Sequence, residues 1–311
     1  MNIDILKNLL RKIIEIIKWL SRRVIAVYFV IFLLSLLVVN NVKVERKRLN
    51  HLMPLYYETL VDENFNEKNF NDIKLREYIN YYKKVAKSTQ SKPEAYSIVG
   101  YCYYYSGDVK KAISFYKKAI DANPYFFWFH YNLGVIYYKE GDFDKAIKSL
   151  KAAGSTAAEN NLMFLSSSKV FFSFIKDPII FVDGIKKRLK QGYFDCFALL
   201  SLSYQKTENF QDMFHCANYA IKENMGDENI FYYYGGIAAF KLKKYEKAVY
   251  FFLESIKRKK THADSFKYLG LALEAMGREE EADKFFEKSE RLSSVNNTVL
   301  FDSEKIKLQI F

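Results

Sequence analysis

Apolar and polar residues follow the period of an α-helix along most of this chain. Residues 99–116 (VGYCYYYSGDVKKAISFY) have apolar positions at helical spacing on both sides of a short polar break, SGD. Residues 133–150 (LGVIYYKEGDFDKAIKSL) repeat this pattern 34 positions later. The pattern predicts two helices joined by a tight turn. Its recurrence predicts a stack of such pairs, because one pair alone cannot bury its apolar face.

The same register extends over residues 93–294. Repeat units begin near Pro93, Phe127, Asn161, Phe194, Asn229 and Ala263, with spacings of 34, 34, 33, 35 and 34 residues. Gly100 and Ala112 are expected to face each other where the two helices of the first unit cross, since small side chains let backbones approach closely. The third unit loses its small residues, and Pro178 is expected to begin its second helix.

These repeats resemble the tetratricopeptide repeat (TPR) family. The resemblance implies an all-α fold, a solenoid of about six helical hairpins over residues 93–294. In that family the first helix of each hairpin lines a concave groove that binds peptides or helices. Carried over by position, the resemblance implies a partner-binding groove at Tyr101, Tyr104, Tyr105, Tyr131, Tyr138, Phe172, Tyr233, Tyr234, Phe240 and Tyr268. Aromatic residues make up 17% of the chain, so composition alone is the alternative explanation of these positions.

An N-terminal transmembrane helix is predicted ahead of the solenoid, at residues 24–39. These sixteen residues (VIAVYFVIFLLSLLVV) contain no charge, and as a helix they would extend about 24 Å, slightly less than the ~30 Å hydrocarbon core of a bilayer. Basic residues precede the segment, and no small-residue cleavage site follows it. An uncleaved signal anchor is therefore expected rather than a cleaved signal peptide.

Three further segments complete the predicted organisation. Residues 1–23 form a basic amphipathic helix, suited to an anionic membrane surface or to a partner helix. Residues 40–92 are expected to form a helical connector that packs on the first repeat, with one amphipathic helix near 70–87. Residues 295–311 are an amphipathic tail, expected to cap the last repeat; docking into a partner is the alternative.

The net charge of +12 does not indicate nucleic-acid binding, because the excess is local. The first 50 residues contain ten Lys and Arg against three Asp and Glu, so +7 of the +12 lies there. More basic residues precede the apolar segment than follow it, which favours a cytoplasmic N-terminus. A single-pass protein of a bacterial inner membrane, with its repeats in the periplasm, is the expected arrangement.

The sequence predicts no enzyme, no metal and no cofactor. The four histidines lie in separate segments, no CxxC pair occurs, and the glycine-rich motifs of nucleotide-binding loops are missing. Cys196 and Cys216 could form a disulfide in the fourth unit, although unpaired core thiols are the preferred interpretation. A catalytic subunit would require a polar active-site residue, and none stands out. No small-molecule substrate is indicated either.

The predicted function is a membrane-anchored protein–protein interaction scaffold that holds an envelope assembly together. The anchor and composition resemble membrane-anchored TPR proteins of bacteria. Among these, the collar components of periplasmic flagellar motors match in architecture, which implies a structural role in that collar. The alternative is an assembly factor or chaperone for exported envelope proteins. A chaperone would bind its partners transiently, whereas a scaffold would co-purify with them stoichiometrically. Lys and Asn clamps for chaperone tails are not matched, since Ser97 and Tyr101 stand at those positions.

Overall fold

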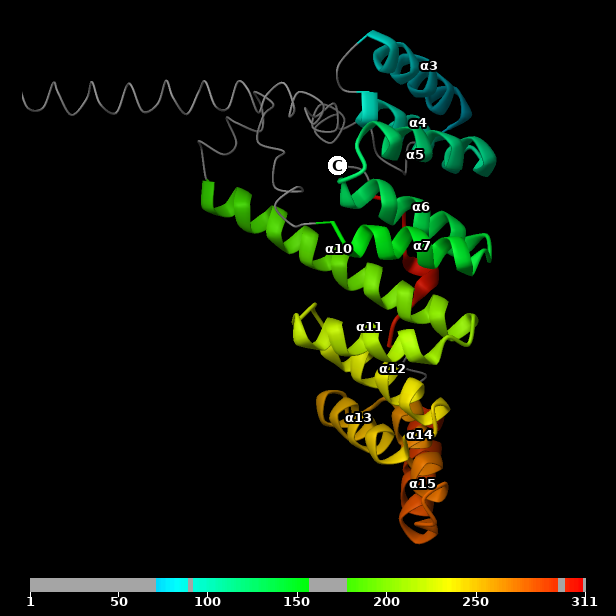
Figure 1. Cartoon of the computed structure of the whole chain (residues 1–311), viewed down its shortest axis with the longest axis vertical. Coiled ribbons are helices and arrows are strands. Elements are labelled where there is room, and N and C mark those ends of the chain that lie inside the picture. Colours follow the sequence, from blue (N-terminus) through cyan, green and yellow to red (C-terminus); the bar gives the residue numbers. More distant parts are fainter. Residues whose placement is uncertain (1–70, 89–91, 157–177, 296–299, 310–311) are drawn as a thin grey trace, which may run out of the picture. The chain divides into compact units, whose positions relative to one another are not determined.

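The computed structural model describes residues 71–88, 92–156, 178–295 and 300–309. The predicted amphipathic helix 1–23, the predicted anchor 24–39 and most of the connector 40–92 lie outside these residues. The chain divides into two compact parts, 1–51 and 52–311, and every described helix belongs to the second. Within the described ranges all regular secondary structure is helical, as the sequence predicted (Figure 1).

The described helices alternate with short turns. They are α3 (Asp72–Ser88), α4 (Lys92–Tyr105), α5 (Val109–Ala122), α6 (Phe127–Lys139), α7 (Phe143–Gly154), α10 (Pro178–Lys206), α11 (Phe210–Lys222), α12 (Glu228–Lys241), α13 (Tyr245–Arg258), α14 (Ala263–Glu274), α15 (Glu279–Val295) and the short 3₁₀ helix η2 (Ser303–Lys305). Helices α4 and α5, α6 and α7, α12 and α13, and α14 and α15 pack as hairpins. Successive hairpins contact one another, which confirms the predicted stack.

Glycines in the first helix of a hairpin allow the second helix to approach closely. A Cβ atom on Gly100 would lie 3.2 Å from the Ala112 carbonyl oxygen and 3.0 Å from the Tyr116 ring, which confirms the predicted crossing of Gly100 and Ala112. At Gly236 a Cβ atom would lie 2.6 Å from the Phe252 ring. The large residue of the second helix therefore occupies the space that the glycine leaves empty.

The turns between paired helices repeat one backbone conformation. Gly107 and Gly141 have φ angles of +83° and +76°, which favour glycine. The next residue caps the second helix: Asp108 accepts a hydrogen bond from the backbone N–H of Lys111 at 3.1 Å, and Asp142 makes the same bond. The α12–α13 turn departs from this pattern, with Lys243 at φ +56° and Lys244 as an N-cap without a side-chain hydrogen bond.

Restoring the missing turn residues will stabilise the protein. We expect Lys243→Gly combined with Lys244→Asp to raise the free energy of unfolding by about 1–2 kcal/mol, because it relieves a left-handed lysine and adds a helix cap. Denaturant unfolding monitored by circular dichroism measures this change. Lys243→Ala is the matched control: it removes the same lysine but keeps a Cβ atom, so it should not stabilise. An equal gain from Lys243→Ala would contradict the backbone explanation.

Helix α10 is longer than the repeat pattern predicted. It begins at Pro178, as expected, but it spans 29 residues and continues through the expected boundary near Phe194. The break between α5 and α6 has Asn123 followed by Pro124, which cannot continue a helix. Gln191 and Gly192 stand at the equivalent place in α10, and neither forces a break. The predicted break between the third and fourth repeats was therefore wrong. The single helix α10 supplies the last helix of the third repeat and the first helix of the fourth.

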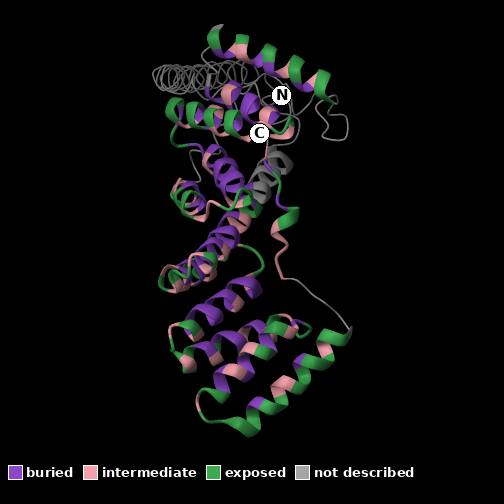
Figure 2. Ribbon diagram, turned by 90° about the vertical axis from the view of Figure 1, so that its right-hand side faces the viewer, coloured by how far each residue is buried: buried purple, intermediate pink, exposed green. Residues whose placement is uncertain are grey.

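The two terminal predictions had different outcomes. The amphipathic helix expected near 70–87 is confirmed as α3, which packs on α4. The expectation that the tail caps the last repeat is wrong for its described part, residues 300–309. The described segment instead contacts α10 through the ring of Phe301 and α6 through hydrogen bonds of its main chain. Figure 2 shows this segment running alongside the stack, away from the last helix. Ile306 and Leu308 of this segment are buried.

No helix in the described ranges is both long and apolar enough to span a bilayer. The predicted anchor at 24–39 lies outside those ranges and remains a prediction.

Candidate protein-binding groove

Helix α6 carries a polar side chain in an almost entirely apolar environment. Ten of the eleven residues from Phe127 to Tyr137 are buried. Asn132 is completely buried among them. Its Nδ2 donates to the Tyr116 hydroxyl at 3.2 Å and to the main-chain oxygen of Gln309 at 2.6 Å. Its Oδ1 accepts from the main-chain N–H of Gln309 at 2.8 Å. One amide side chain thus binds both main-chain groups of a residue 177 positions away.

The bound segment is the C-terminal tail, residues 300–309. Ile306 and Leu308 are buried, whereas Lys305 before them and Lys307 between them are exposed. This alternation is that of an extended chain with one face against the protein. Extended backbone angles at Ile306, φ −69° and ψ 127°, agree with it.

The direction of the tail follows from its contacts with α10 and with the C-terminal end of α6. The ring of Phe301 lies 6.0 Å from the ring of Phe194 on α10. Farther along, Lys139 at the end of α6 donates to the Glu304 carbonyl oxygen at 3.3 Å. Since Glu304 pairs with Lys139 and Gln309 with Asn132, the tail runs antiparallel to α6. The tail is therefore held in extended form against α6 and α10, and the surface that these two helices present to it is called the groove below.

The predicted groove residues of the first repeat lie at the edge of this site. Tyr101 is buried, and Tyr104 and Tyr105 are half-buried. The ring centroids of Tyr101 and Tyr105 are 4.5 Å apart, and those of Tyr104 and Tyr105 are 5.5 Å apart. Burial raises the pKa of Tyr104, and the charges of Glu140 and Glu304 raise it further. Tyr104 therefore lies close to the tail as well as to its own cluster.

The predicted residues of the second and fifth repeats lie deeper. Tyr131 is completely buried against Phe127, and no described residue forms a hydrogen bond with its hydroxyl. Tyr138 is half-buried and contacts Phe143 of the paired helix with 5.6 Å between ring centroids. Burial raises the pKa of the Tyr234 hydroxyl, and the proximity of Tyr138 adds to the shift. Helices α6 and α12 thus bring two of the predicted tyrosines together.

The remaining predicted residues form a cluster that continues from Tyr234, whose ring centroid lies 5.8 Å from that of Tyr233. Tyr233 and Tyr268 have ring centroids 6.2 Å apart, and Phe240 lies at the same distance from Tyr268. Tyr268 also stacks on Phe252 of α13, so it contributes to packing between hairpins. Phe172 lies outside the described residues. Most of the nine predicted residues that the structure describes pack on other aromatic rings, and their role in binding a partner stays a prediction.

Sequence reasoning missed Asn132 and the tail as its ligand. Asn132 stands between Tyr131 and Leu133, and a lone amide within such an apolar run was the available signal. A buried polar side chain must find hydrogen-bond partners, so its position alone demanded an explanation. The identity of the partner could not be inferred, because the pairing joins residues that the repeat pattern does not relate.

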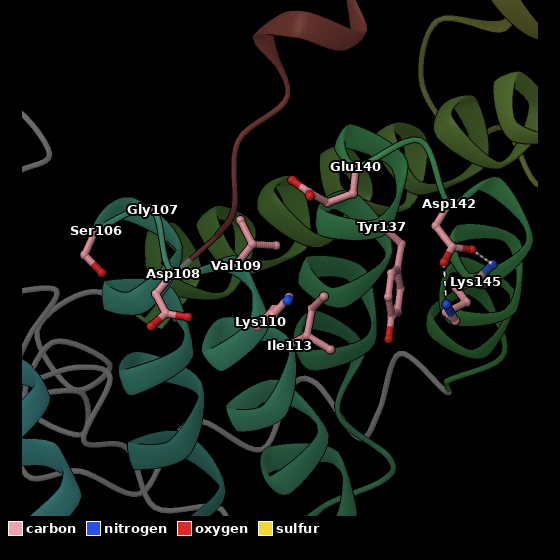
Figure 3. Close-up of a pocket in the computed structure, with 10 residues that line it drawn as sticks. All are labelled: Ser106, Gly107, Asp108, Val109, Lys110, Ile113, Tyr137, Glu140, Asp142 and Lys145. Atoms are coloured by element: carbon pink, nitrogen blue, oxygen red, sulfur yellow. Dashed lines mark hydrogen bonds and ion pairs between the residues drawn. The ribbon is translucent and has the colours of Figure 1, made fainter.

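A second hollow lies at the turn edge of the first two repeats (Figure 3). Its lining includes Asp108, Lys110, Tyr137, Asp142 and Lys145, and its volume is about 800 Å³. The two carboxylates are already engaged as helix caps, and each pairs with a lysine of its own helix. The hollow therefore results from stacked turns and offers no converging catalytic groups.

Metal-ligating side chains do not gather in the described ranges. There, no cluster of His, Cys, Asp and Glu could hold a metal ion. Cys102, Cys196 and Cys216 are free and buried, so the possible disulfide between the last two is not formed. Burial raises the pKa of the Cys102 and Cys216 thiols to about 12, which disfavours the reactive thiolate.

Comparison with known proteins agrees with the helical-hairpin architecture. A family model described as TPR repeat matches residues 100–141, and one described as tetratricopeptide repeat matches residues 129–157 and 269–296. A search of curated proteins gave no match to this chain.

Solved structures of similar fold are repeat proteins. The crystal structure of YrrB, described as a TPR protein with an unusual peptide-binding site, is 15% identical, covers 70% of this chain and 94% of its own, and has a TM-score of 0.50. The crystal structure of MamA is 21% identical, covers 63% of this chain and 95% of its own, and has a TM-score of 0.47. At such identities the likeness concerns the fold. The repeat register, the hairpin stack and the family models agree that this chain contains tetratricopeptide repeats, matched at residues 100–157 and 269–296.

Proposed function

We propose that this protein is a non-enzymatic scaffold that binds protein partners through extended segments held in the groove along α6. TPR folds are protein-interaction modules. The observation that carries the proposal is the pairing of Asn132 with both main-chain groups of Gln309. A side-chain amide in this position binds peptide backbone, and every peptide offers the same pair of groups.

The groove supplies both elements that peptide recognition requires. Main-chain hydrogen bonds give an extended segment its orientation, and buried positions for alternate side chains give specificity. Both are present on α6, where Ile306 and Leu308 are buried beside the Asn132 pairing. The peptide-binding site named for YrrB supports the same class of partner.

The proposal places the scaffold at a membrane. The apolar segment 24–39 would anchor it, and the basic flank would hold the N-terminus in the cytoplasm. The repeats would then lie in the periplasm of a bacterium and join an envelope assembly, with the flagellar motor collar as the specific candidate. Reporter fusions after Phe311 test this arrangement: a reporter active only outside the cytoplasm should give signal, and signal from a cytoplasm-active reporter would contradict it.

Site-specific photo-crosslinking in cells tests partner binding. A photoreactive amino acid at Tyr104 or Tyr138, beside the groove, should yield crosslinked protein adducts. The matched controls are Tyr219 and Tyr250, which are exposed aromatic residues on α11 and α13. Equal adducts at all four positions would contradict a groove-centred function. Adducts recovered at fixed stoichiometry would favour a scaffold over an assembly factor.

A further inference from the structure

The tail occupies the groove that the proposed function assigns to partners. We propose that residues 300–309 are a tethered ligand of this groove, and that a partner must displace them with an extended segment that has aliphatic side chains at alternate positions. This inference rests on the proposed function and specifies both its partner class and its regulation. The partner is expected to have an extended backbone and alternate aliphatic side chains because the tail that occupies the groove has both.

The polar contacts of the tail are made by its main chain. Asn132 contacts the N–H and the carbonyl oxygen of Gln309, and Lys139 contacts the carbonyl oxygen of Glu304. The side-chain amide of Gln309 donates instead to the Lys307 carbonyl oxygen at 3.4 Å, within the tail itself. A peptide of different sequence could therefore make the same contacts with α6.

The apolar contacts of the tail define which peptides fit. Ile306 is 9% exposed and Leu308 is 3% exposed, so both side chains are covered by the protein. Lys305 is exposed and pairs with Asp302 of the tail at 3.1 Å. The groove thus selects aliphatic residues two positions apart and leaves the residues beside them in solvent. A partner segment with the pattern aliphatic–polar–aliphatic–polar satisfies the same contacts.

The tail can leave without dismantling the hairpins. Its hydrogen bonds to α6 are made with Asn132 and Lys139, and the paired helices pack on each other independently of it. Departure of the tail opens Asn132 to a new peptide backbone. Because the tail is tethered, its effective concentration at the groove is high and the groove is open for only a fraction of the time. The apparent affinity of a free competitor equals its intrinsic affinity multiplied by that fraction.

A peptide-binding experiment with the full chain tests the proposal. The probe is a fluorescein-labelled synthetic peptide with the sequence of residues 300–311, followed by fluorescence anisotropy. We expect Ile306→Asp combined with Leu308→Asp, which releases the tail, to bind the probe at least tenfold more tightly than the unaltered chain. Adding Asn132→Ala to the released variant should weaken binding about tenfold. Lys305→Gln is the control within the same segment, since it removes only an exposed ion pair with Asp302, and it should resemble the unaltered chain.

Hydrogen exchange of the unaltered chain gives a second, independent test. Excess unlabelled peptide should accelerate exchange across residues 304–309, and a peptide with Asp at both aliphatic positions should not. Equal probe affinity for the unaltered and released chains, or exchange that the peptide does not change, would overturn the proposal. If the released variant does not unfold cooperatively, the exchange result decides alone. Partner adducts at Tyr138 that persist unchanged in the released variant would leave the proposed scaffold function standing while refuting the tethered ligand.

Discussion

Replacing Glu94 by glutamine will stabilise the protein increasingly as the pH rises. Glu94, in the first turn of α4, is 3% exposed, and its Oε2 has no hydrogen-bond partner among the residues that the structure describes. Burial raises the pKa of this carboxyl from 4.5 to about 8, since the charged form loses its hydration. We expect the difference in unfolding free energy between Glu94→Gln and the unaltered chain to grow by about 4 kcal/mol from pH 4 to pH 8.

The sign follows from the two protonation states. Below pH 4.5 the carboxyl is protonated in both the folded and the unfolded chain, so it costs nothing. Between pH 4.5 and about 8 only the unfolded chain ionises, which progressively favours unfolding. Urea unfolding at a series of pH values measures the effect. Glu290→Gln, at an exposed position of α15, is the control and should give a difference that does not grow. A constant difference for Glu94→Gln would refute a buried neutral carboxyl.

Substituting Gly236 by valine will destabilise the protein by about 3 kcal/mol. The new Cβ atom would lie 2.6 Å from Cε1 and 2.7 Å from Cδ1 of Phe252, closer than carbon atoms can approach. Phe252 is completely buried and cannot move aside without disturbing the hairpin of α12 and α13. Overpacking of this kind outweighs the helix propensity gained by removing a glycine. Thermal and urea unfolding measure the loss.

A double-mutant cycle identifies the cause of that loss. Phe252→Leu shortens the opposing side chain, so combining it with Gly236→Val should cost at least 1 kcal/mol less than the sum of the single changes. Gly154→Val is the comparison at a looser contact, where the nearest atom to a Cβ is Cζ of Phe197 at 3.1 Å. It should cost less than Gly236→Val. Additive losses in the cycle would show that the Phe252 contact is not responsible.

The sequence by itself determined the repeated hairpin. Gly100 and Ala112 indicated a close helix crossing, and the SGD and EGD breaks indicated the turns that Gly107 and Gly141 form. The start of α10 at Pro178 and the amphipathic helix α3 were also predictable. These features depend on interactions between residues close in the chain or at a fixed repeat spacing, so a periodic pattern records them.

Only the tertiary structure decided that the C-terminal tail occupies the groove and that α10 continues through the predicted repeat boundary near Phe194. Helix α10 continues past Gly192 because no proline stops it, and a Cβ atom there would lie 2.4 Å from the Trp128 ring of α6. Asn132 pairs with Gln309 across 177 positions of sequence. The amphipathic pattern of the tail showed that it needed an apolar surface but was equally compatible with any exposed face of the stack. The choice among those faces depends on three-dimensional complementarity, which the local order of residues does not record.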